Sequence, residues 1–337
     1  MKGLELCRRY FEECAGTILR REFPEMMERA AVGLVGEGSE CLGFDDEFSQ
    51  DHDFGPGFCI WLSPEDAERY GRRLQAAYEQ LPGEFLGVRR LETRRGAGRV
   101  GVMELHSFFA RFIGAEQPPR NLRRWLNLPE HFLCLLSGGE VYQDPAGEFT
   151  RIRDAVRAYY PEDVRVKKIA ARAAEMSRSG QYNYARAMRR GDVVSACLAL
   201  ADFMRSAMRM IYLCNSVYAP YDKWLYRGLT DLRDGKHLIF GPRFSGPMRL
   251  AGAVPLIGEI SRLRPDVSLW EHPETLPEVN QNDPCVQKIE EICRLTLSEL
   301  RREGLTEGTD NFLERHTWDI MAKIQDPELA RCHVLEG

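Results

Sequence analysis

The chain has 337 residues, and its 46 Lys and Arg against 51 Asp and Glu give a net charge of −5. This length predicts about two domains with enough buried surface to fold without disulfides or structural metals, which excludes small stapled scaffolds. The acidic balance excludes a general basic field of the kind that drives non-specific nucleic-acid binding. A composition of 44% hydrophobic and 29% charged residues is typical of soluble globular proteins.

The ten cysteines are scattered without a Cys-x-x-Cys pair, which disfavours a zinc ribbon or a thioredoxin-type redox site. We interpret them as reduced thiols, which fits a reducing compartment. The first residues carry charges every few positions, unlike a signal peptide, and no apolar run approaches the roughly 18 residues of a membrane span. The sequence therefore predicts a cytoplasmic protein without membrane contact.

The first part of the chain alternates predicted helices and strands. Apolar residues at helical spacing predict an amphipathic helix over residues 4–21. Short apolar runs predict strands over 30–35, 51–62, 99–105 and 140–143. Ser63 and Pro64 predict the start of a helix that ends near Leu81, and a further helix follows the third strand.

From about residue 150 the pattern is dominated by helices. Apolar residues at three- and four-residue spacing predict helices over 164–176, 183–188, 193–213, 225–232 and 284–302. Pro and Gly are frequent over residues 240–282, which predicts a long connection within this part. We therefore expect one domain of helices and strands over residues 1–150 and a helical domain over residues 151–337.

One stretch, which begins at Gly36 and reads GEGSECLGFDDEFSQDHDF, carries the most informative chemistry. A dinucleotide-binding fingerprint fits poorly, because Cys41 stands at the third glycine position and an acidic run follows. An EF-hand loop that starts at Asp51 would lack its ligands and its turn glycine. A nucleophile elbow needs glycines on both sides of Ser39, where Glu37 and Cys41 stand.

Gly38 and Ser39 are followed, after eleven residues, by Asp51 and Asp53 on the second predicted strand. Side chains two apart on a strand share a face at roughly 7 Å, so these two carboxylates can converge on shared cations. Adjacent carboxylates repel each other unless a cation lies between them, and their oxygens suit Mg²⁺ bridged to phosphates. The backbone amides and the hydroxyl of the Gly38-Ser39 turn can bind a phosphate.

The opposing interpretation of Asp51 and Asp53 is a solvated acidic turn, because an acidic run, DDE, precedes them. The aromatic and β-branched residues that follow Asp53 disfavour it. Ser39 can also be a plain helix N-cap, which is compatible with phosphate binding.

The Gly-Ser turn, the spacer and the Asp-x-Asp pair resemble the signature of the nucleotidyltransferase superfamily with the DNA polymerase β-like palm. The longer string GSECLGFDDEFSQDHDFGPGF is similar to the bacterial domain-of-unknown-function 4037 family, which is assigned to that superfamily. The later strings QYNYARAMRRGD and LCNSVYAPYDKW are similar to the same family, so the resemblance extends over most of the chain.

The resemblance implies an α+β fold, a nucleotidyltransferase palm with a mixed β-sheet, followed by an all-helical domain. It implies transfer of a nucleoside monophosphate from a nucleoside triphosphate to a hydroxyl acceptor, with Mg²⁺ or Mn²⁺ and release of pyrophosphate, and we expect AMP to be the group transferred. Asp51 and Asp53 would hold two metal ions, and Gly38 and Ser39 would bind the nucleotide. The third carboxylate of the pattern would be Glu104, in the string RVGVMEL, although Asp is more usual there.

Four residues of the helical part are further candidates, each with a structural alternative. Lys223 would reach the triphosphate, or it is a surface lysine beside Trp224. Tyr182, Tyr184 and Arg186 would line an acceptor pocket, or the two tyrosines are packing residues at the start of a helix.

Two more features stay secondary candidates. His106 follows Glu104 closely and would assist as a base, or it is structural. The basic run formed by Arg89, Arg90, Arg94 and Arg95 would contact the triphosphate or a tRNA-like acceptor, or it is a solvated loop.

The acidic chain favours a small-molecule acceptor over RNA, because its field opposes a polyanion. A protein or RNA acceptor stays an alternative, and no DNA partner is expected. The alternative function is a non-catalytic regulator on the same fold that binds a nucleotide or a partner. The intact Asp51-x-Asp53 pair argues against it, because a binding module does not need two adjacent anions.

Overall fold

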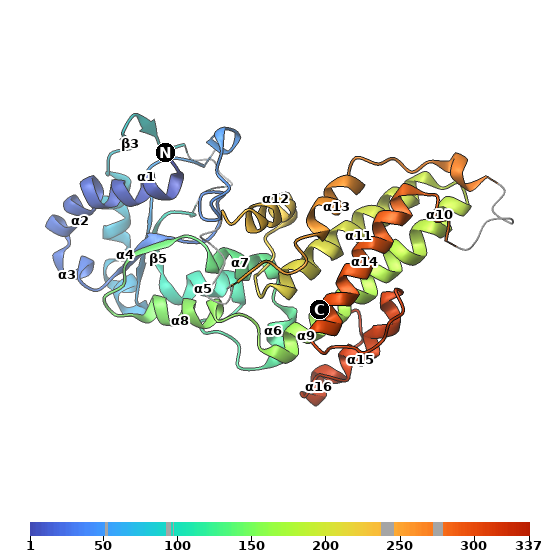
Figure 1. Ribbon diagram of the computed structural model, residues 1–337. Coiled ribbons are helices and arrows are strands. Elements are labelled where there is room, and N and C mark those ends of the chain that lie inside the picture. The colour runs from blue at the N-terminus through green and yellow to red at the C-terminus, as the bar shows by residue number, and fades with distance from the viewer. Residues whose placement is uncertain (51–52, 92–95, 97, 237–245, 272–278) are drawn as a thin grey trace. The chain divides into compact units, whose positions relative to one another are not determined.

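The computed structural model describes residues 1–50, 53–91, 96, 98–236, 246–271 and 279–337 (Figure 1). The chain divides into two compact units. The first holds Met1–Arg120 and Leu128–Tyr159, and the second holds Asn121–Asn127, Tyr160–Lys236 and the described residues from 246 onward. The boundary expected at residue 150 falls inside α8 (Glu148–Arg157), because this helix packs with the first unit.

The first unit is built on a four-stranded mixed sheet. Its strands are β1 (Ala31–Leu34), β2 (Cys59–Leu62), β5 (Gly101–Glu104) and β6 (Glu140–Gln143), in the order β5-β2-β1-β6. β1 pairs antiparallel with β2 and β6, whereas β2 pairs parallel with β5. The short strands β3 (Glu84–Phe85) and β4 (Val88–Arg89) form a separate hairpin. The expected α+β class with a mixed sheet is therefore confirmed.

The second predicted strand is much shorter than expected. It was expected over residues 51–62, but β2 begins only at Cys59. Asp53 has φ 50° and Gly55 has φ 124°, and Pro56 has no amide hydrogen to donate. These residues cannot continue a ladder of extended backbone, so the expectation that Asp53 lies on a strand is wrong.

Helices cover both faces of the sheet (Figure 1). Those of the first unit are α1 (Gly3–Tyr10), α2 (Gly16–Glu22), α3 (Pro24–Met27), α4 (Pro64–Glu79), α5 (Leu105–Ile113), α7 (Glu130–Ser137) and α8. Val32 and Ile60 join a buried core with residues of α1, α2 and α4. On the other face Trp61 stacks on Phe149 of α8, with ring centroids 4.0 Å apart. Neighbouring residues of β2 thus face opposite layers, as the alternation of a strand requires.

The helix boundaries follow the sequence signals closely. A π-helical segment, Phe11–Ala15, joins α1 to α2, so helical backbone runs through the range expected at residues 4–21. Ser63 caps α4, because its Oγ accepts a hydrogen bond from the Asp66 amide at 3.1 Å. The helix predicted after the third strand is α5.

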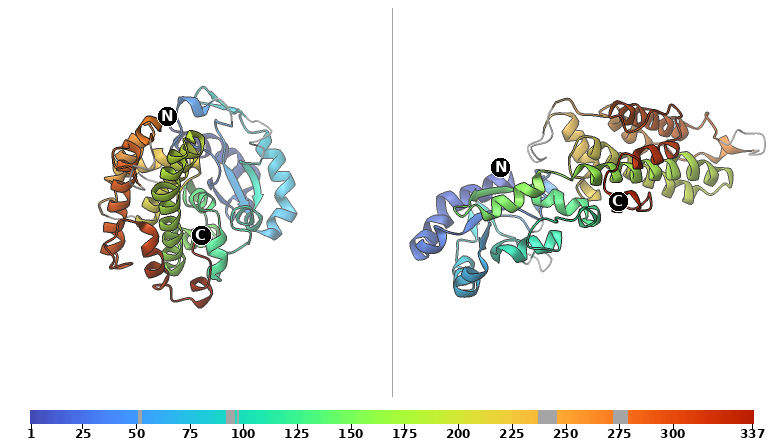
Figure 2. Two further views of the ribbon diagram at one scale, coloured as in Figure 1. Left: turned by 90° about the vertical axis from the view of Figure 1, so that its right-hand side faces the viewer. Right: turned by 90° about the horizontal axis from the view of Figure 1, so that it is seen from below.

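In its described residues the second unit contains helices and no strand, and its long helices α9, α11 and α14 lie side by side (Figures 1 and 2). Its α-helices are α6 (Leu122–Asn127), α9 (Glu162–Met176), α10 (Ala185–Arg189), α11 (Val193–Cys214), α12 (Asp222–Arg233), α13 (Ala253–Ile260), α14 (Pro284–Arg302), α15 (Thr317–Met321) and α16 (Pro327–Ala330). A π-helical segment, Ser177–Tyr184, joins α9 to α10, and short 3₁₀ turns occupy Val267–Trp270 and Leu313–His316. None of the described helices is long and apolar enough to cross a bilayer.

A buried lysine fastens the last described residues to α9. Lys167 has no exposed surface, and its Nζ donates hydrogen bonds to the carbonyl oxygens of His333 and Val334, both at 3.0 Å. Burial lowers the pKa of Lys167 from 10.5 to about 8. The charged form of this lysine is therefore less favoured in the folded protein than in the unfolded chain.

Replacement of two glycines of the first unit by alanine should have opposite effects on the free energy of unfolding. A Cβ on Gly33 of β1 would lie 2.3 Å from the carbonyl oxygen of Glu140 in β6, whereas a Cβ on Gly71 of α4 would meet nothing within 4 Å. Gly33→Ala should lower the free energy of unfolding by about 2 kcal/mol, because backbone must move. Gly71→Ala should raise it by about 0.5–1 kcal/mol, because alanine favours the helix. Urea unfolding of both variants checks this, and equal effects would contradict it.

Lys167 predicts a pH dependence of stability. Between its folded pKa of about 8 and its ordinary value of 10.5, the unfolded chain binds more protons than the folded protein. The free energy of unfolding should therefore rise with pH through this window, by on the order of 3 kcal/mol for this group alone. The measurement is the difference between wild type and Lys167→Met in urea unfolding from pH 7 to 10.5. Parallel curves for the two proteins would refute the prediction.

Candidate functional site

The site begins at the turn that follows β1. Gly36 and Gly38 have φ values of 115° and 130°, in the left-handed region that glycine adopts readily. A Cβ on Gly38 would lie 2.3 Å from Nη2 of Arg99 and 2.6 Å from Oε2 of Glu40. Glycine at position 38 therefore allows both the turn and the close approach of a charged pair.

Ser39 follows in a series of turns rather than in a helix. Its carbonyl oxygen accepts hydrogen bonds from the amides of Phe44 at 2.9 Å and Leu42 at 3.2 Å. Its hydroxyl makes no hydrogen bond to another described residue, and the side chain is half-buried. The turn thus presents an uncommitted hydroxyl beside a glycine backbone.

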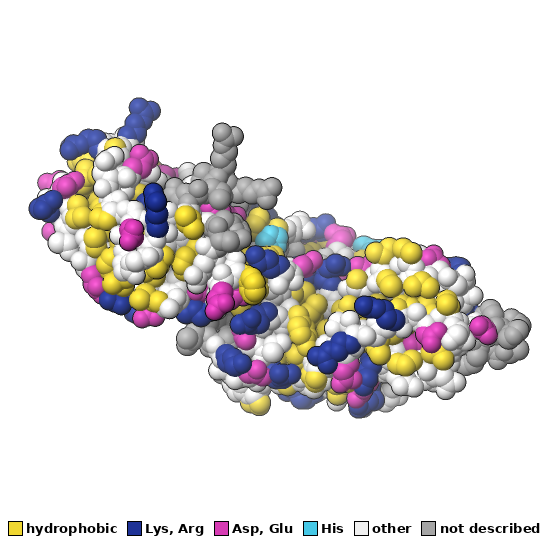
Figure 3. Space-filling view, turned by 90° about the horizontal axis from the view of Figure 1, so that it is seen from above, with side chains coloured by type: hydrophobic (Ala, Val, Ile, Leu, Met, Phe, Trp, Pro, Cys, Tyr) yellow, Lys and Arg dark blue, Asp and Glu magenta, His cyan; other side chains and the backbone are white. Residues whose placement is uncertain are grey.

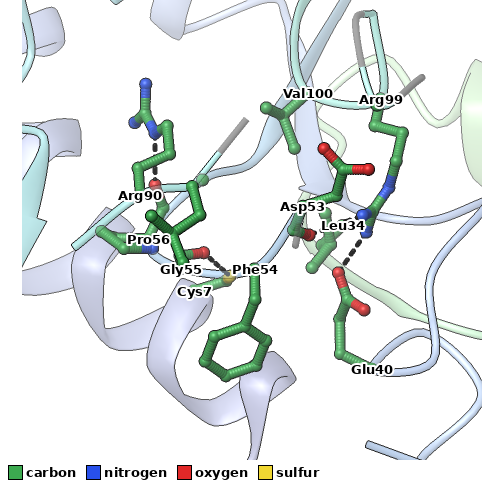
Figure 4. Close-up of a pocket in the computed structure, with 13 residues that line it drawn as sticks. Cys7, Leu34, Glu40, Asp53, Phe54, Gly55, Pro56, Arg90, Arg99 and Val100 are labelled. Atoms are coloured by element: carbon green, nitrogen blue, oxygen red, sulfur yellow. Dashed lines mark hydrogen bonds and ion pairs between the residues drawn. The ribbon is translucent and has the colours of Figure 1, made fainter. Parts of the chain in front are cut away.

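Arg99 joins this turn to the loop that carries Asp53 (Figure 4). Its Nε donates to the carbonyl oxygen of Glu37 at 3.1 Å, and its Nη1 donates to the carbonyl oxygen of Asp53 at 2.6 Å. Its Nη2 forms a hydrogen-bonded ion pair with the carboxylate of Glu40. One guanidinium group thus uses all three of its nitrogens to hold two loops together.

The Arg99–Glu40 pair is largely removed from water. Burial raises the pKa of Glu40, and the attraction of Arg99 opposes this rise. Burial lowers the pKa of Arg99, but the attraction of Glu40 outweighs it, so the pKa lies above its ordinary value. Arg99 therefore remains a cation, and Glu40 depends on it for compensation.

Asp53 adopts a left-handed backbone conformation, with φ 50°. Such a conformation costs on the order of 1–3 kcal/mol for a residue with a side chain. Its carboxylate packs on the backbone of Gly96, where a Cβ would lie 2.1 Å from Oδ1. An aspartate at a position that glycine favours points to a role for its side chain.

Glu40, Asp53 and Arg99 line one cavity of about 30 Å³, which has room for one or two water molecules. Its described lining residues are Cys7, Leu34, Glu40, Asp53, Phe54, Gly55, Pro56, Gly57, Arg90, Leu91, Gly96, Arg99 and Val100. A nucleotide is far larger, so it would contact this cavity only at the rim.

The structure does not bring the predicted third carboxylate to this cavity. Glu104 is the last residue of β5 and pairs with Leu62, the last residue of β2, whereas Asp53 precedes the first residue of β2. The two carboxylates are therefore at opposite ends of the parallel pair β2–β5. Glu104 caps α5 instead, because its carboxylate accepts hydrogen bonds from the amides of His106 and Ser107, both at 2.7 Å.

The pKa of Glu104 agrees with this capping role. Burial raises it, but the hydrogen bonds from Ser107 and from the His106 amide outweigh burial, so the pKa lies below its usual value. Glu104 is thus a carboxylate whose charge stabilises the start of a helix. Its neighbour His106 pairs with Glu148 at 3.0 Å.

The remaining predicted residues are dispersed. Asp51 lies outside the described residues. Lys223, near the start of α12, places its Nζ 4.9 Å from the ring centroid of Trp224. Tyr184 is fully buried and donates a hydrogen bond to Asp283 at 2.8 Å, so it is part of the core, whereas Tyr182 and Arg186 line a cavity of the second unit.

The arginine run is also divided. Arg90 lines the cavity of Asp53 and donates from its Nε to the carbonyl oxygen of Pro56 at 2.7 Å. Arg89 belongs to the hairpin strand β4, while Arg94 and Arg95 lie outside the described residues.

Sequence reasoning missed Glu40 and Arg99. Glu40 lies between Ser39 and the apolar pair Cys41-Leu42. A charged residue in such an apolar neighbourhood indicates a side chain that is buried with a partner. Arg99 lies 59 positions away from it, so no local pattern connects them.

The side chains that line this cavity include one carboxylate that could bind a hard cation and one that is already paired. Carboxylate oxygens suit Mg²⁺, and Asp53 supplies them, but the carboxylate of Glu40 is already compensated by Arg99. Among the residues that the structure describes, no group of three or more His, Cys, Asp or Glu side chains is arranged to hold a metal ion. The second carboxylate of the Asp-x-Asp pair belongs to Asp51, outside that part of the chain.

Residues 125–225 match the model of a family described as Domain of unknown function (DUF4037). This match supports the resemblance of the chain to the DUF4037 family. The matched region runs from α6 into α12 and includes Tyr182, Arg186 and Lys223, but it does not reach Gly38 or Asp53. No curated protein and no solved structure matches the chain.

The buried pair predicts a strong dependence of stability on Arg99. Arg99→Gln leaves the carboxylate of Glu40 buried without its cation and should cost about 3–5 kcal/mol of unfolding free energy. The double variant Glu40→Gln/Arg99→Gln removes both charges and should be more stable than Arg99→Gln alone. Arg111→Gln, which breaks an exposed pair with Glu37 at 3.8 Å, is the control and should change little. Additive effects of the two single substitutions in urea unfolding would contradict the pairing.

Proposed function

We propose that the protein is a nucleotidyltransferase, which moves a nucleoside monophosphate, AMP in the first instance, from a nucleoside triphosphate to the hydroxyl group of an acceptor. The acceptor oxygen bonds to the α-phosphorus, the bond to the departing pyrophosphate breaks, and the hydroxyl proton is released. The proposal rests on the resemblance of the Gly-Ser and Asp-x-Asp motifs to the signature of the DNA polymerase β-like palm.

The observation that carries the proposal is the junction of two loops through Arg99. Gly38 and Ser39 offer a glycine backbone and a hydroxyl. Asp53 offers a carboxylate, in a strained backbone conformation, on a cavity that Glu40, the next residue after Ser39, also lines. Arg99 holds both loops and remains a cation beside the turn. A phosphate at the turn would meet the hydroxyl of Ser39 and the positive potential of Arg99.

Asp51 and Asp53 are the residues that would hold Mg²⁺, or Mn²⁺ in its place. When bound, the ions would neutralise the charge of the triphosphate and of the leaving pyrophosphate. Asp53 would contribute its carboxylate from a loop fixed at its backbone by Arg99, so the side chain is oriented before a ligand arrives. Glu104 is not part of the proposed site, because it caps α5 at the other end of β5.

A small-molecule acceptor fits the charge distribution better than a nucleic acid. The chain carries a net charge of −5, and on the face drawn in Figure 3 the Lys and Arg side chains are interspersed with Asp and Glu side chains. RNA binding depends on a field that neutralises many phosphates at once. A protein acceptor needs no such field and remains the second choice.

A non-catalytic nucleotide-binding regulator is the second candidate function. One observation favours it: in the described residues, the carboxylates lining the cavity are Asp53 and Glu40, and Glu40 is paired with Arg99. A regulator would bind the triphosphate without releasing pyrophosphate. Measuring binding and pyrophosphate release on the same protein separates the two candidates.

The decisive test compares wild type with Asp53→Asn. Thermal unfolding is measured with ATP, GTP, CTP or UTP, each with and without MgCl₂. We expect a Mg²⁺-dependent rise in Tm for one triphosphate, on the order of 5 °C at about 100 times its Kd, because a ligand of the folded state stabilises it. Asp53→Asn should lose the rise. The absence of any triphosphate effect on wild type would refute nucleotide binding.

Two control variants sharpen this test. Asp154→Asn removes an exposed carboxylate of α8 and should keep the full rise in Tm. Glu104→Gln should lower Tm without ligand, because it weakens the cap of α5, and should keep the rise with ligand. Pyrophosphate release is then measured with hydroxylated amines as acceptors. Binding without release, for every acceptor tried, would favour the regulator.

A further inference from the structure

The second unit contains a cavity of about 470 Å³, which the proposed function does not use. Its described lining residues are Gln181, Tyr182, Ala185, Arg186, Val279, Gln281, Glu290, Asp310, Asn311, Phe312 and Arg315. This volume lies in the range of small-molecule sites, and aromatic and charged side chains line the cavity together. Its residues come from the π-helical segment, α10, the chain just before α14, α14 itself and the chain around Asn311.

Gln181 builds the wall of this cavity. It is buried, and its Nε2 donates to the carbonyl oxygen of Asn311 at 2.8 Å and to the carboxylate of Glu290 at 3.1 Å. Its Oε1 accepts a hydrogen bond from the Leu313 amide at 3.0 Å. One amide therefore fixes three segments of the chain around the cavity, and it leaves Glu290 in a defined position.

Glu290 carries a negative charge that no cation compensates within the described residues. Its carboxylate accepts hydrogen bonds from the side-chain amides of Gln181 and Asn311, both of which are neutral donors. The Oδ1 of Asn311 is buried and has no hydrogen-bond donor in the described part of the chain. This wall of the cavity therefore has more acceptors than donors, and an ammonium group supplies both the missing charge and the missing donors.

Arg186 provides the opposite charge on the same cavity. Its guanidinium group packs on the ring of Tyr182, with Cζ 4.7 Å from the ring centroid, and donates a hydrogen bond to the Tyr182 hydroxyl. It forms no ion pair with a described acidic residue. The other two charged lining residues, Asp310 and Arg315, pair with each other. An anion at Arg186 would therefore find a cation already oriented by an aromatic ring.

We propose that this cavity binds a small zwitterion, whose ammonium group contacts Glu290 and whose carboxylate or phosphate group contacts Arg186. Within the described residues, Glu290 and Arg186 form no ion pair, and their two opposite charges on a single cavity match the two charges of such a molecule. A ligand with only one charge would leave the other side chain uncompensated. The inference stands independently of nucleotidyl transfer, because all of these contacts belong to the second unit.

The test measures binding to the full-length protein by titration calorimetry. The probes are ω-amino acids of increasing length from glycine to 6-aminohexanoate, together with O-phosphoethanolamine. Pentylamine and pentanoate serve as singly charged comparisons. We expect one length of ω-amino acid, or O-phosphoethanolamine, to bind about tenfold or more tightly than either singly charged molecule. The ω-amino acids and O-phosphoethanolamine distinguish a carboxylate from a phosphate as the preferred anion.

Matched variants locate the site. Glu290→Gln and Arg186→Gln should each weaken binding of the best zwitterion about tenfold or more. Glu291→Gln removes the same charge from the next position of α14, where the side chain does not line the cavity and pairs with Lys288 at 3.6 Å. Arg190→Gln removes a charge just after α10. Both controls should bind like wild type. Because Arg186 is exposed, its variant should fold even if Glu290→Gln is destabilised.

Either of two results would overturn the proposal. The first is that no zwitterion of the panel binds more tightly than pentylamine and pentanoate. The second is that Arg186→Gln, with the thermal stability of wild type, binds the best zwitterion as tightly as wild type does.

Discussion

The guanidinium group of Arg99 is the interaction on which the first unit depends most. It holds together the turn after β1 and the loop before β2, which lie at the same end of the antiparallel pair β1–β2. Both segments have backbone with positive φ, at Gly38 without a steric cost and at Asp53 with one, and a planar cation with several donors can hold both segments at once. The pairing with Glu40 keeps most of this cation out of water, which strengthens its hydrogen bonds.

The sheet gives Arg99 its position, and the sequence predicted that sheet well. Buried strands such as β1 have apolar residues throughout, and the helix starts have clear capping signals, so their places follow from local chemistry. The prediction that β2 extends back to Asp51 was wrong for a physical reason. Strand alternation was inferred from residue spacing, whereas the positive φ values of Asp53 and Gly55 and the proline between Gly55 and Gly57 end the extended backbone.

The candidate site was only partly predictable, because its contacts join distant positions. Gly38 and Asp53 were found from one motif, but the pair of Glu40 and Arg99 spans 59 positions and leaves no local pattern. Glu104 was chosen by its order among the strands. Only the parallel register of β5 with β2 shows that it lies at the far end of the sheet. In the helical unit, Tyr182 and Tyr184 were grouped by sequence, yet one is exposed and the other buried.

Both tyrosines belong to the π-helical segment Ser177–Tyr184, and its winding has a further consequence. Backbone bonding from each residue to the fifth along winds the helix more loosely than α-helical bonding to the fourth, so residues five apart come to share a face. Gln181 and Arg186 are five apart, and both line the same cavity. Rewinding this segment as an α-helix would turn one of them away from the other. The placement of these two residues on one cavity therefore depends on the loose winding of the helix that carries them.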